Sequence, residues 1–161
     1  MEEIMSGNFF VFFYQFDGID IGIAGENKNV TEVFFGKNIP DGFIVSETPL
    51  LKKTALQIKE YFGGKRKKFT IPLAMHGTEF QMAVWQALQN IPYGETCSYK
   101  DIAVQTGRPK AVRAVGMANH RNPVSIIVPC HRVIGSNGKL VGYGGGLPLK
   151  KYLLDLERKN R

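Results

Sequence analysis

The sequence predicts an α/β (α+β) protein made of two small domains, residues 1–72 and residues 73–161. The first stretch is rich in short aromatic and β-branched segments separated by turn residues, a pattern typical of a small antiparallel sheet. The second stretch carries repeated helix-start signals and predicts a mostly helical domain of the winged helix-turn-helix kind. With 161 residues, 43% of them hydrophobic, the chain is long enough to bury a core in each domain.

Three strands are expected in the N-terminal sheet, at residues 9–14, 19–24 and 29–35. Asp17-Gly18 and Glu26-Asn27 provide turns between them, and such spacing predicts an antiparallel meander. No residue pattern in these strands suggests chemistry, so we expect this domain to act as a scaffold.

One helix should cross this sheet. Thr48 can cap it, Pro49 suits its first position, and Gly63-Gly64 ends it. Its apolar residues recur on one face: Leu51, Ala55, Ile58 and Phe62. The basic run at residues 65–68 follows the helix and is interpreted as a solvated linker, with DNA contact as the alternative.

The C-terminal domain begins with a helix whose start is well marked. Thr78 and Gln81 form a capping box, and Trp85, the only tryptophan, is expected in the core. Ser98 and Asp101 form a second capping box that begins a short helix ended by Gly107.

Pro109 suits the first turn of the next helix, which should extend to about Asn119. Two short helices joined by a glycine-containing turn are typical of a helix-turn-helix, although many such pairs bind nothing. The small side chains of Ala111 and Ala114 would let the second helix approach a partner closely. Arg113 projects from its middle, either as a DNA contact or as an ordinary surface charge.

An apolar run at residues 124–128 ends at Pro129 and is followed by Cys130 and His131. Because proline lacks an N–H, we expect Cys130 where a strand gives way to a turn. The thiolate is the nucleophilic form of cysteine, and a neighbouring histidine can accept the thiol proton directly or through a water. The alternative is a buried structural cysteine.

A glycine-rich segment follows Cys130. The turn at residues 135–138 should return the chain to Leu140-Val141 and form a small hairpin. Four glycines then surround Tyr143 and predict a shaped loop before a helix that starts at Leu147-Pro148. Its expected apolar stripe comprises Leu149, Tyr152, Leu153 and Leu156. Glu157, at the edge of that stripe, could orient His131 or lie in solvent.

The net charge of +7 lies entirely in the half that contains Cys130. Residues 1–75 hold nine basic and nine acidic residues, whereas residues 76–161 hold twelve basic and five acidic ones. This segregation favours a nucleic-acid partner over charge that serves solubility alone.

Several classes of protein are disfavoured by composition. No apolar run reaches the length of a membrane span, and the N-terminus lacks the basic start of a secretory signal. Two cysteines far apart make no disulfide framework, and three scattered histidines suggest no metal site. We therefore expect a cytoplasmic protein without a metal or cofactor.

The Ile-Val-Pro-Cys-His-Arg-Val-Ile segment, the Gly-Tyr-Gly-Gly-Gly-Leu loop and the Lys-Lys-Tyr-Leu-Leu-Asp-Leu-Glu helix resemble the O6-alkylguanine-DNA alkyltransferases. The resemblance covers residues 78–157. It implies single-turnover transfer of an alkyl group from O6-alkylguanine, and from O4-alkylthymine, in double-stranded DNA to Cys130. It also implies a monomer that needs no cofactor.

The resemblance assigns roles to named residues. His131, Glu157 and Asn122 would assist Cys130. The base pocket would comprise Tyr99, Val133, Tyr143, Gly144 and Gly145. Arg113 would replace the extruded nucleotide in the minor groove, on a surface shared with Lys110, Ala111 and Ala114. Gly144 stands where many relatives have serine, Ser125 stands where some relatives have proline, and Cys97 lies outside the pattern.

Two other functions are compatible with parts of the sequence. A DNA-binding module of the same fold could recognise alkylated bases without repairing them, although the Cys130-His131 pair disfavours this. A Cys-His hydrolase or a thiol oxidoreductase would use Cys130 but would leave the helix-turn-helix unexplained.

Overall fold

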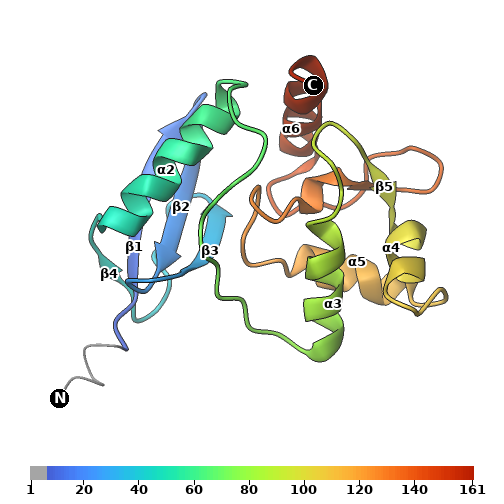
Figure 1. Ribbon diagram of the computed structural model, residues 1–161, viewed down its shortest axis with the longest axis horizontal. Coiled ribbons are helices and arrows are strands. Elements are labelled where there is room, and N and C mark those ends of the chain that lie inside the picture. Colours follow the sequence, from blue (N-terminus) through green and yellow to red (C-terminus); the bar gives the residue numbers. More distant parts are fainter. Residues whose placement is uncertain (1–6) are drawn as a thin grey trace. The chain divides into compact units, whose positions relative to one another are not determined.

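The computed structural model describes residues 7–161, which fold as two compact units that divide between Met75 and His76 (Figure 1). The division falls three residues after the domain boundary expected from the sequence. Each unit has its own hydrophobic core.

The first unit is built on a four-stranded sheet with the order β3-β2-β1-β4. Strands β1 (Phe10–Phe16), β2 (Ile19–Gly25) and β3 (Val30–Phe35) form the expected antiparallel meander. Asp17 and Gly18 make the first turn with positive φ angles of 50° and 78°, which short polar residues and glycine tolerate best.

The sheet is mixed rather than purely antiparallel. A fourth strand, β4 (Ile44–Val45), pairs in parallel with β1 at its edge. Two residues are too few to show an alternating hydrophobic pattern, so nothing in the local sequence distinguishes this strand from a loop.

Helix α2 (Pro49–Phe62) lies across one face of this sheet, as expected (Figure 1). The Thr48 hydroxyl caps it by accepting a hydrogen bond from the Leu51 N–H at 3.2 Å. Its residues Leu51, Ile58 and Tyr61 are fully buried.

The second unit contains four α-helices: α3 (Glu79–Leu88), α4 (Tyr99–Gln105), α5 (Val112–His120) and α6 (Leu147–Lys159). Both predicted capping boxes are present, at Thr78 with Gln81 and at Ser98 with Asp101. Trp85 is buried, and its indole Nε1–H donates to the Ala118 carbonyl at 2.9 Å. This bond ties α3 to α5.

Helix α5 begins later than the sequence predicted. Pro109 and Lys110 lie in a turn, closed by a hydrogen bond from the Ala111 N–H to the Arg108 carbonyl at 2.9 Å. Ala111 is the N-cap residue and supplies no side-chain cap. The fixed φ of proline suits a turn as well as a first helical turn, which explains the error.

The expected strand before Cys130 does not form. Residues 125–127 make a tight turn in which buried Ile126 has a φ of 72°, an uncommon conformation for a β-branched residue. Cys130–Arg132 then form a 3₁₀-helix, η1. A short apolar run fits a buried turn as well as a strand, and periodicity alone does not separate the two.

The expected hairpin after Cys130 is also absent. Strand β6 (Val133–Ile134) pairs in parallel with β5 (Cys97–Ser98) and not with Leu140-Val141. The predicted turn itself is present, because the Gly138 N–H donates to the Gly135 carbonyl at 2.9 Å.

Helix α6 has a different buried face from the one predicted. Its buried residues are Lys150, Leu153, Leu154 and Glu157. Tyr152 is exposed, and Leu149 and Leu156 are half-buried. None of the helices within residues 7–161 has the length and hydrophobicity required to cross a membrane.

Candidate active site

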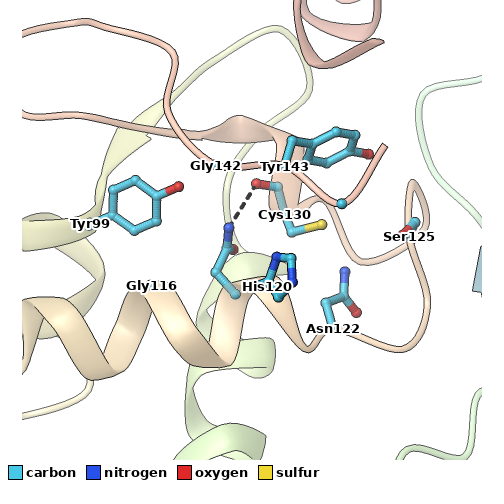
Figure 2. Close-up of a pocket in the computed structure, with 10 residues that line it drawn as sticks. Tyr99, Gly116, His120, Asn122, Ser125, Cys130, Gly142 and Tyr143 are labelled. Atoms are coloured by element: carbon cyan, nitrogen blue, oxygen red, sulfur yellow. Dashed lines mark hydrogen bonds between the residues drawn. The ribbon is translucent and has the colours of Figure 1, made fainter. Parts of the chain in front are cut away.

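A pocket of about 60 Å³ opens beside Cys130 in the second unit, with room for several water molecules (Figure 2). Its walls come from η1, from the last two turns of α5, from the segment between α5 and η1, from the first residue of α4 and from the glycine-rich loop before α6. The lining residues are Tyr99, Gly116, Asn119, His120, Asn122, Ser125, Cys130, Gly142, Tyr143 and Gly144.

Cys130 is the first residue of η1 and is only 5% exposed. Burial raises the pKa of its thiol, while a hydrogen bond from Asn122 and the positive charge of Lys150 act in the opposite direction. The net shift is upward, so the resting thiol is protonated at neutral pH.

Asn122 braces the turn that precedes Cys130. Its Nδ2 donates to the Val128 carbonyl at 2.8 Å, and its Oδ1 accepts from the Val124 N–H at 3.0 Å. The side chain thereby spans both ends of the apolar turn and presents its amide to the Cys130 thiol.

His131 and Arg132, which follow Cys130 in η1, both bond to the carboxylate of Glu157. His131 Nε2 lies 2.6 Å from Oε2 of Glu157, and all three side chains are buried. Arg132 donates through Nε to Oε1 at 2.8 Å and through Nη2 to Oε2 at 3.0 Å. The Gly94 N–H adds a fourth hydrogen bond to Oε1 at 3.0 Å. Glu157 therefore faces inward rather than solvent.

The pKa values of this group follow from its burial and its partners. Burial lowers the pKa of His131 below 6.5 even though Glu157 raises it, so the imidazole is neutral at pH 7. Burial alone would raise the pKa of Glu157, but the hydrogen bonds and charges of His131 and Arg132 lower it far below 4.5.

Lys150 was not singled out from the sequence, yet it is fully buried next to the site. Its Nζ donates to the carbonyls of Val133, Val141 and Gly142 at 2.6, 2.8 and 3.3 Å. It thereby joins β6 to the start of the loop that lines the pocket. The only sequence signal is its position three residues before Leu153 and seven before Glu157 on one helical face.

The aromatic residues of the expected base pocket take different positions. Tyr99 and Tyr143 line the pocket, and the Tyr99 hydroxyl donates to the Val141 carbonyl at 3.1 Å. Burial raises the pKa of both phenols. Gly144 lines the pocket as expected, whereas Val133 and Gly145 do not, and the Val133 carbonyl is bonded to Lys150.

Helix α5 contributes three residues to the pocket wall and also carries the expected DNA-binding residues. Arg113 and Ala114 are exposed and do not line the pocket, and Lys110 is exposed in the preceding turn. Gly116, Asn119 and His120 line the pocket and were not predicted to do so. One helix thus carries both the expected DNA-binding residues and part of the pocket wall.

The remaining cysteine, Cys97, is half-buried, and burial raises the pKa of its thiol. It lies in β5 opposite Val133 and does not line the pocket. Within residues 7–161, no group of three or more His, Cys, Asp or Glu side chains could hold a metal ion.

Residues 79–159 match the family model described as the DNA binding domain of 6-O-methylguanine DNA methyltransferase. Among curated proteins, the chain is 50% identical to the methylated-DNA–protein-cysteine methyltransferase of Methanosarcina barkeri, over 86% of this chain and 90% of that protein. It is also 50% identical to the inducible methylated-DNA–protein-cysteine methyltransferase of Bacillus subtilis, over 85% of this chain and 78% of that protein.

Two solved structures are similar to this chain over nearly its whole length. The structure of Mycobacterium tuberculosis OGT in complex with DNA is 41% identical and covers 93% of each chain, with a TM-score of 0.88. The Mycobacterium tuberculosis O6-methylguanine methyltransferase is 39% identical over 95% of this chain and 94% of that chain, with a TM-score of 0.87. With this agreement in sequence and fold, the chain belongs to the methylated-DNA–protein-cysteine methyltransferase family.

Proposed function

We propose that this protein repairs DNA by transferring a methyl or larger alkyl group from O6 of guanine, and from O4 of thymine, to Sγ of Cys130. The observation that carries the proposal is the position of the Cys130 thiol. It lines a pocket, and the next residue is a buried neutral histidine bonded to a carboxylate. Membership of the methyltransferase family supports the same reaction.

The Glu157 carboxylate determines which nitrogen of His131 carries the proton. An ionised carboxylate only accepts hydrogen bonds, so His131 Nε2 must be the protonated nitrogen in the 2.6 Å contact. The basic nitrogen is then Nδ1. It would receive the Cys130 thiol proton through a bridging water, and Glu157 would stabilise the resulting imidazolium.

The thiolate would then displace the alkylated base directly. A bond forms between Sγ and the alkyl carbon, and the bond between that carbon and O6 breaks. Its electron pair stays on the guanine, which takes up a proton and becomes ordinary guanine. Because a thioether has no easy hydrolytic exit, each molecule would react once.

A base inside a duplex lies beyond the reach of a buried thiol, so the nucleotide must be extruded. We assign this task to the exposed face of α5, with Arg113 filling the gap and Lys110, Ala111 and Ala114 close to the minor groove. Unstacking costs a few kcal/mol, which an inserted side chain partly offsets. Tyr99 would donate to the bound base after releasing the Val141 carbonyl, its partner here.

The test uses a duplex with one O6-methylguanine that carries a labelled methyl group. The wild-type protein, Cys130→Ala and the matched control Cys97→Ala are mixed with it, and labelled peptides are identified by mass spectrometry. We expect one equivalent of label on the Cys130 peptide in the wild type and the control, and none in Cys130→Ala.

Other outcomes would point to the competing functions. Tighter binding of the alkylated duplex without transfer would indicate a lesion-recognition protein. Turnover of an acyl or disulfide substrate, with no methyl transfer, would indicate a hydrolase or an oxidoreductase.

A further inference from the structure

Lys150 is a buried cation without a counter-charge in the part of the chain that the structure describes. Its side chain is fully buried, and within residues 7–161 it forms no ion pair with a carboxylate. The three backbone carbonyls that accept hydrogen bonds from Nζ solvate the ammonium group but carry no net charge. A buried charge is costly unless an opposite charge compensates it. The position of this cation therefore calls for an explanation beyond its hydrogen bonds.

The buried carboxylate of the same helix is already compensated. Glu157 lies seven residues further along α6, about 10 Å away along the helix axis. It accepts two hydrogen bonds from the guanidinium group of Arg132. One positive and one negative charge balance there, and the charge of Lys150 remains.

The ammonium group lies next to the pocket wall that contains Cys130. Nζ bonds to the carbonyl of Gly142 at 3.3 Å and lies 5.8 Å from the centre of the Tyr99 ring, and both residues line the pocket. Val133, whose carbonyl also accepts from Nζ, donates its own N–H to the Cys130 carbonyl. The positive charge of Lys150 opposes the effect of burial on the Cys130 thiol and favours its ionised form. The group placed to balance the ammonium is thus Cys130, once its thiol has lost the proton.

We propose that Lys150 is the counter-charge of the Cys130 thiolate and makes the thiol more reactive by stabilising that thiolate. Lys150 is not among the residues that line the pocket, so it acts through Cys130 and not on the substrate. It keeps its own proton while the thiol proton passes to His131, the bond from Sγ to carbon forms and the bond from carbon to O6 breaks. This inference rests on the proposed function only for the identity of the electrophile, because every reaction of the thiolate would depend on the same charge.

The experiment measures two reactions of Cys130 as a function of pH. The first is single-turnover methyl transfer from a duplex with one O6-methylguanine, and the second is alkylation by iodoacetamide, a neutral reagent that needs no DNA. All proteins carry Cys97→Ala, so that Cys130 is the only thiol. Lys150→Gln removes the charge and keeps a hydrogen-bond donor, Lys150→Arg keeps the charge, and Lys151→Gln is the matched control at an exposed position.

The charge of Lys150 can be removed by pH alone. Burial lowers the pKa of Lys150 to about 8, although the charge on Cys130 raises it, so the ammonium is present at pH 7 and is lost as the pH rises through 8. The pKa values of the neighbouring imidazole and carboxylate are lowered, and those of the neighbouring phenols are raised. These groups therefore keep their charge between about pH 7 and pH 9: His131, Glu157, Tyr99 and Tyr143.

We expect Lys150→Gln to slow both reactions roughly 3- to 20-fold at pH 7. The thiolate fraction falls, while the intrinsic nucleophilicity of the sulfur rises by about half as much on a logarithmic scale. The difference from the wild type should narrow above pH 8, where the wild type loses the same charge. Lys150→Arg keeps its proton over this range, so its rate relative to the wild type should increase above pH 8. Lys151→Gln should follow the wild type.

Faster alkylation by iodoacetamide in Lys150→Gln would mean that the variant only loosens the loop and exposes the thiol, and the inference would be rejected. An equal loss at every pH, or no loss, would reject it as well. If Lys150→Gln does not fold, Lys150→Arg decides, and a rate relative to the wild type that is constant with pH would reject the inference. If the wild type reacts with iodoacetamide but takes no methyl group from the duplex, the proposed function fails, while the iodoacetamide rates still test the role of Lys150.

Discussion

Glu157 is the residue on which the buried charges of the second unit depend. It accepts four hydrogen bonds, from His131, from the backbone of Gly94 and twice from Arg132. Removing one partner of a buried ion pair leaves the other charge uncompensated in a low dielectric, which costs more than the pair contributes to stability. The carboxylate is therefore needed for folding as well as for orienting the imidazole.

Glu157→Gln should lower the free energy of unfolding by about 3–5 kcal/mol, measured by urea denaturation, because Arg132 loses its counter-charge. Asp155→Asn, on the exposed side of the same helix, is the control and should change it by less than about 1 kcal/mol. Similar stabilities for the two variants would contradict the assigned role of Glu157.

The same carboxylate predicts a pH dependence. The pKa of Glu157 in the folded protein lies below its ordinary value of 4.5, so its contribution is complete above pH 4.5 and is lost as the pH falls toward the folded value. The unfolding free energy of the wild type should therefore fall more steeply below pH 4.5 than that of Glu157→Gln. Parallel curves for the two proteins would show that this carboxylate is not the group that titrates.

At this scale, sequence reasoning singled out Cys130 and His131, and it missed the buried residues that surround them. Cys130 and His131 stand out because a thiol beside an imidazole is a potential nucleophile with its base, and because a glycine-rich segment follows them. Lys150 and Asn119 look like solvent-exposed helix residues, and only their spacing from buried neighbours indicates an inward position. What they bond to depends on distant backbone carbonyls, which no local pattern specifies.

Among the elements, the glycine-rich loop depends on one lysine. Lys150→Met would leave the carbonyls of Val133, Val141 and Gly142 without their shared donor. We expect a loss of about 2 kcal/mol or more in stability, faster hydrogen exchange in residues 139–146 and slower alkyl transfer. Lys151→Met, which changes the adjacent exposed lysine, should leave all three quantities close to those of the wild type.

Arg113 on α5 gives a second prediction at this scale. Because it would act on the duplex and not on the chemistry, Arg113→Ala should slow transfer from duplex DNA roughly 10-fold or more, while the slow reaction with free O6-methylguanine base stays unchanged. Arg158→Ala, the same change on the exposed side of α6, is the matched control. Equal slowing with duplex and free base would assign Arg113 to the pocket instead.

The elements that were predicted correctly are those with local signals. The capping boxes of α3 and α4 and the Thr48 cap of α2 need only residues within one helical turn. The failures involve partners far along the chain, since β4 pairs with β1, and β6 pairs with β5. The prediction for residues 125–127 was wrong for another reason, because the apolar residues of this turn have the composition of a strand.

For the whole molecule, the charge distribution predicts how binding responds to salt. Five exposed cations lie on or beside α4 and α5: Lys100, Arg108, Lys110, Arg113 and Arg121. Each phosphate contact releases counterions and adds about 0.9 to the slope of log affinity against log salt. We expect a slope between about −2 and −5 for duplex binding, measured by fluorescence anisotropy.

Charge-removing variants test where this salt dependence originates. Lys110→Gln should reduce the magnitude of the slope by about 1. Lys52→Gln, which removes an exposed cation from α2 in the half whose net charge is zero, should leave the slope unchanged. Equal effects of the two variants would show that binding responds to net charge and not to the helix-turn-helix surface.

The hydrogen bond from the Trp85 indole to the Ala118 carbonyl constrains how the sequence of α5 can evolve. It fixes the rotation of α5 about its own axis, with Arg113 outward and Asn119 on the pocket side. Successive helical residues differ by about 100° in direction, so inserting or deleting one residue between these two positions would turn one of them to the wrong side. This segment can therefore diversify by substitution, but its length is constrained.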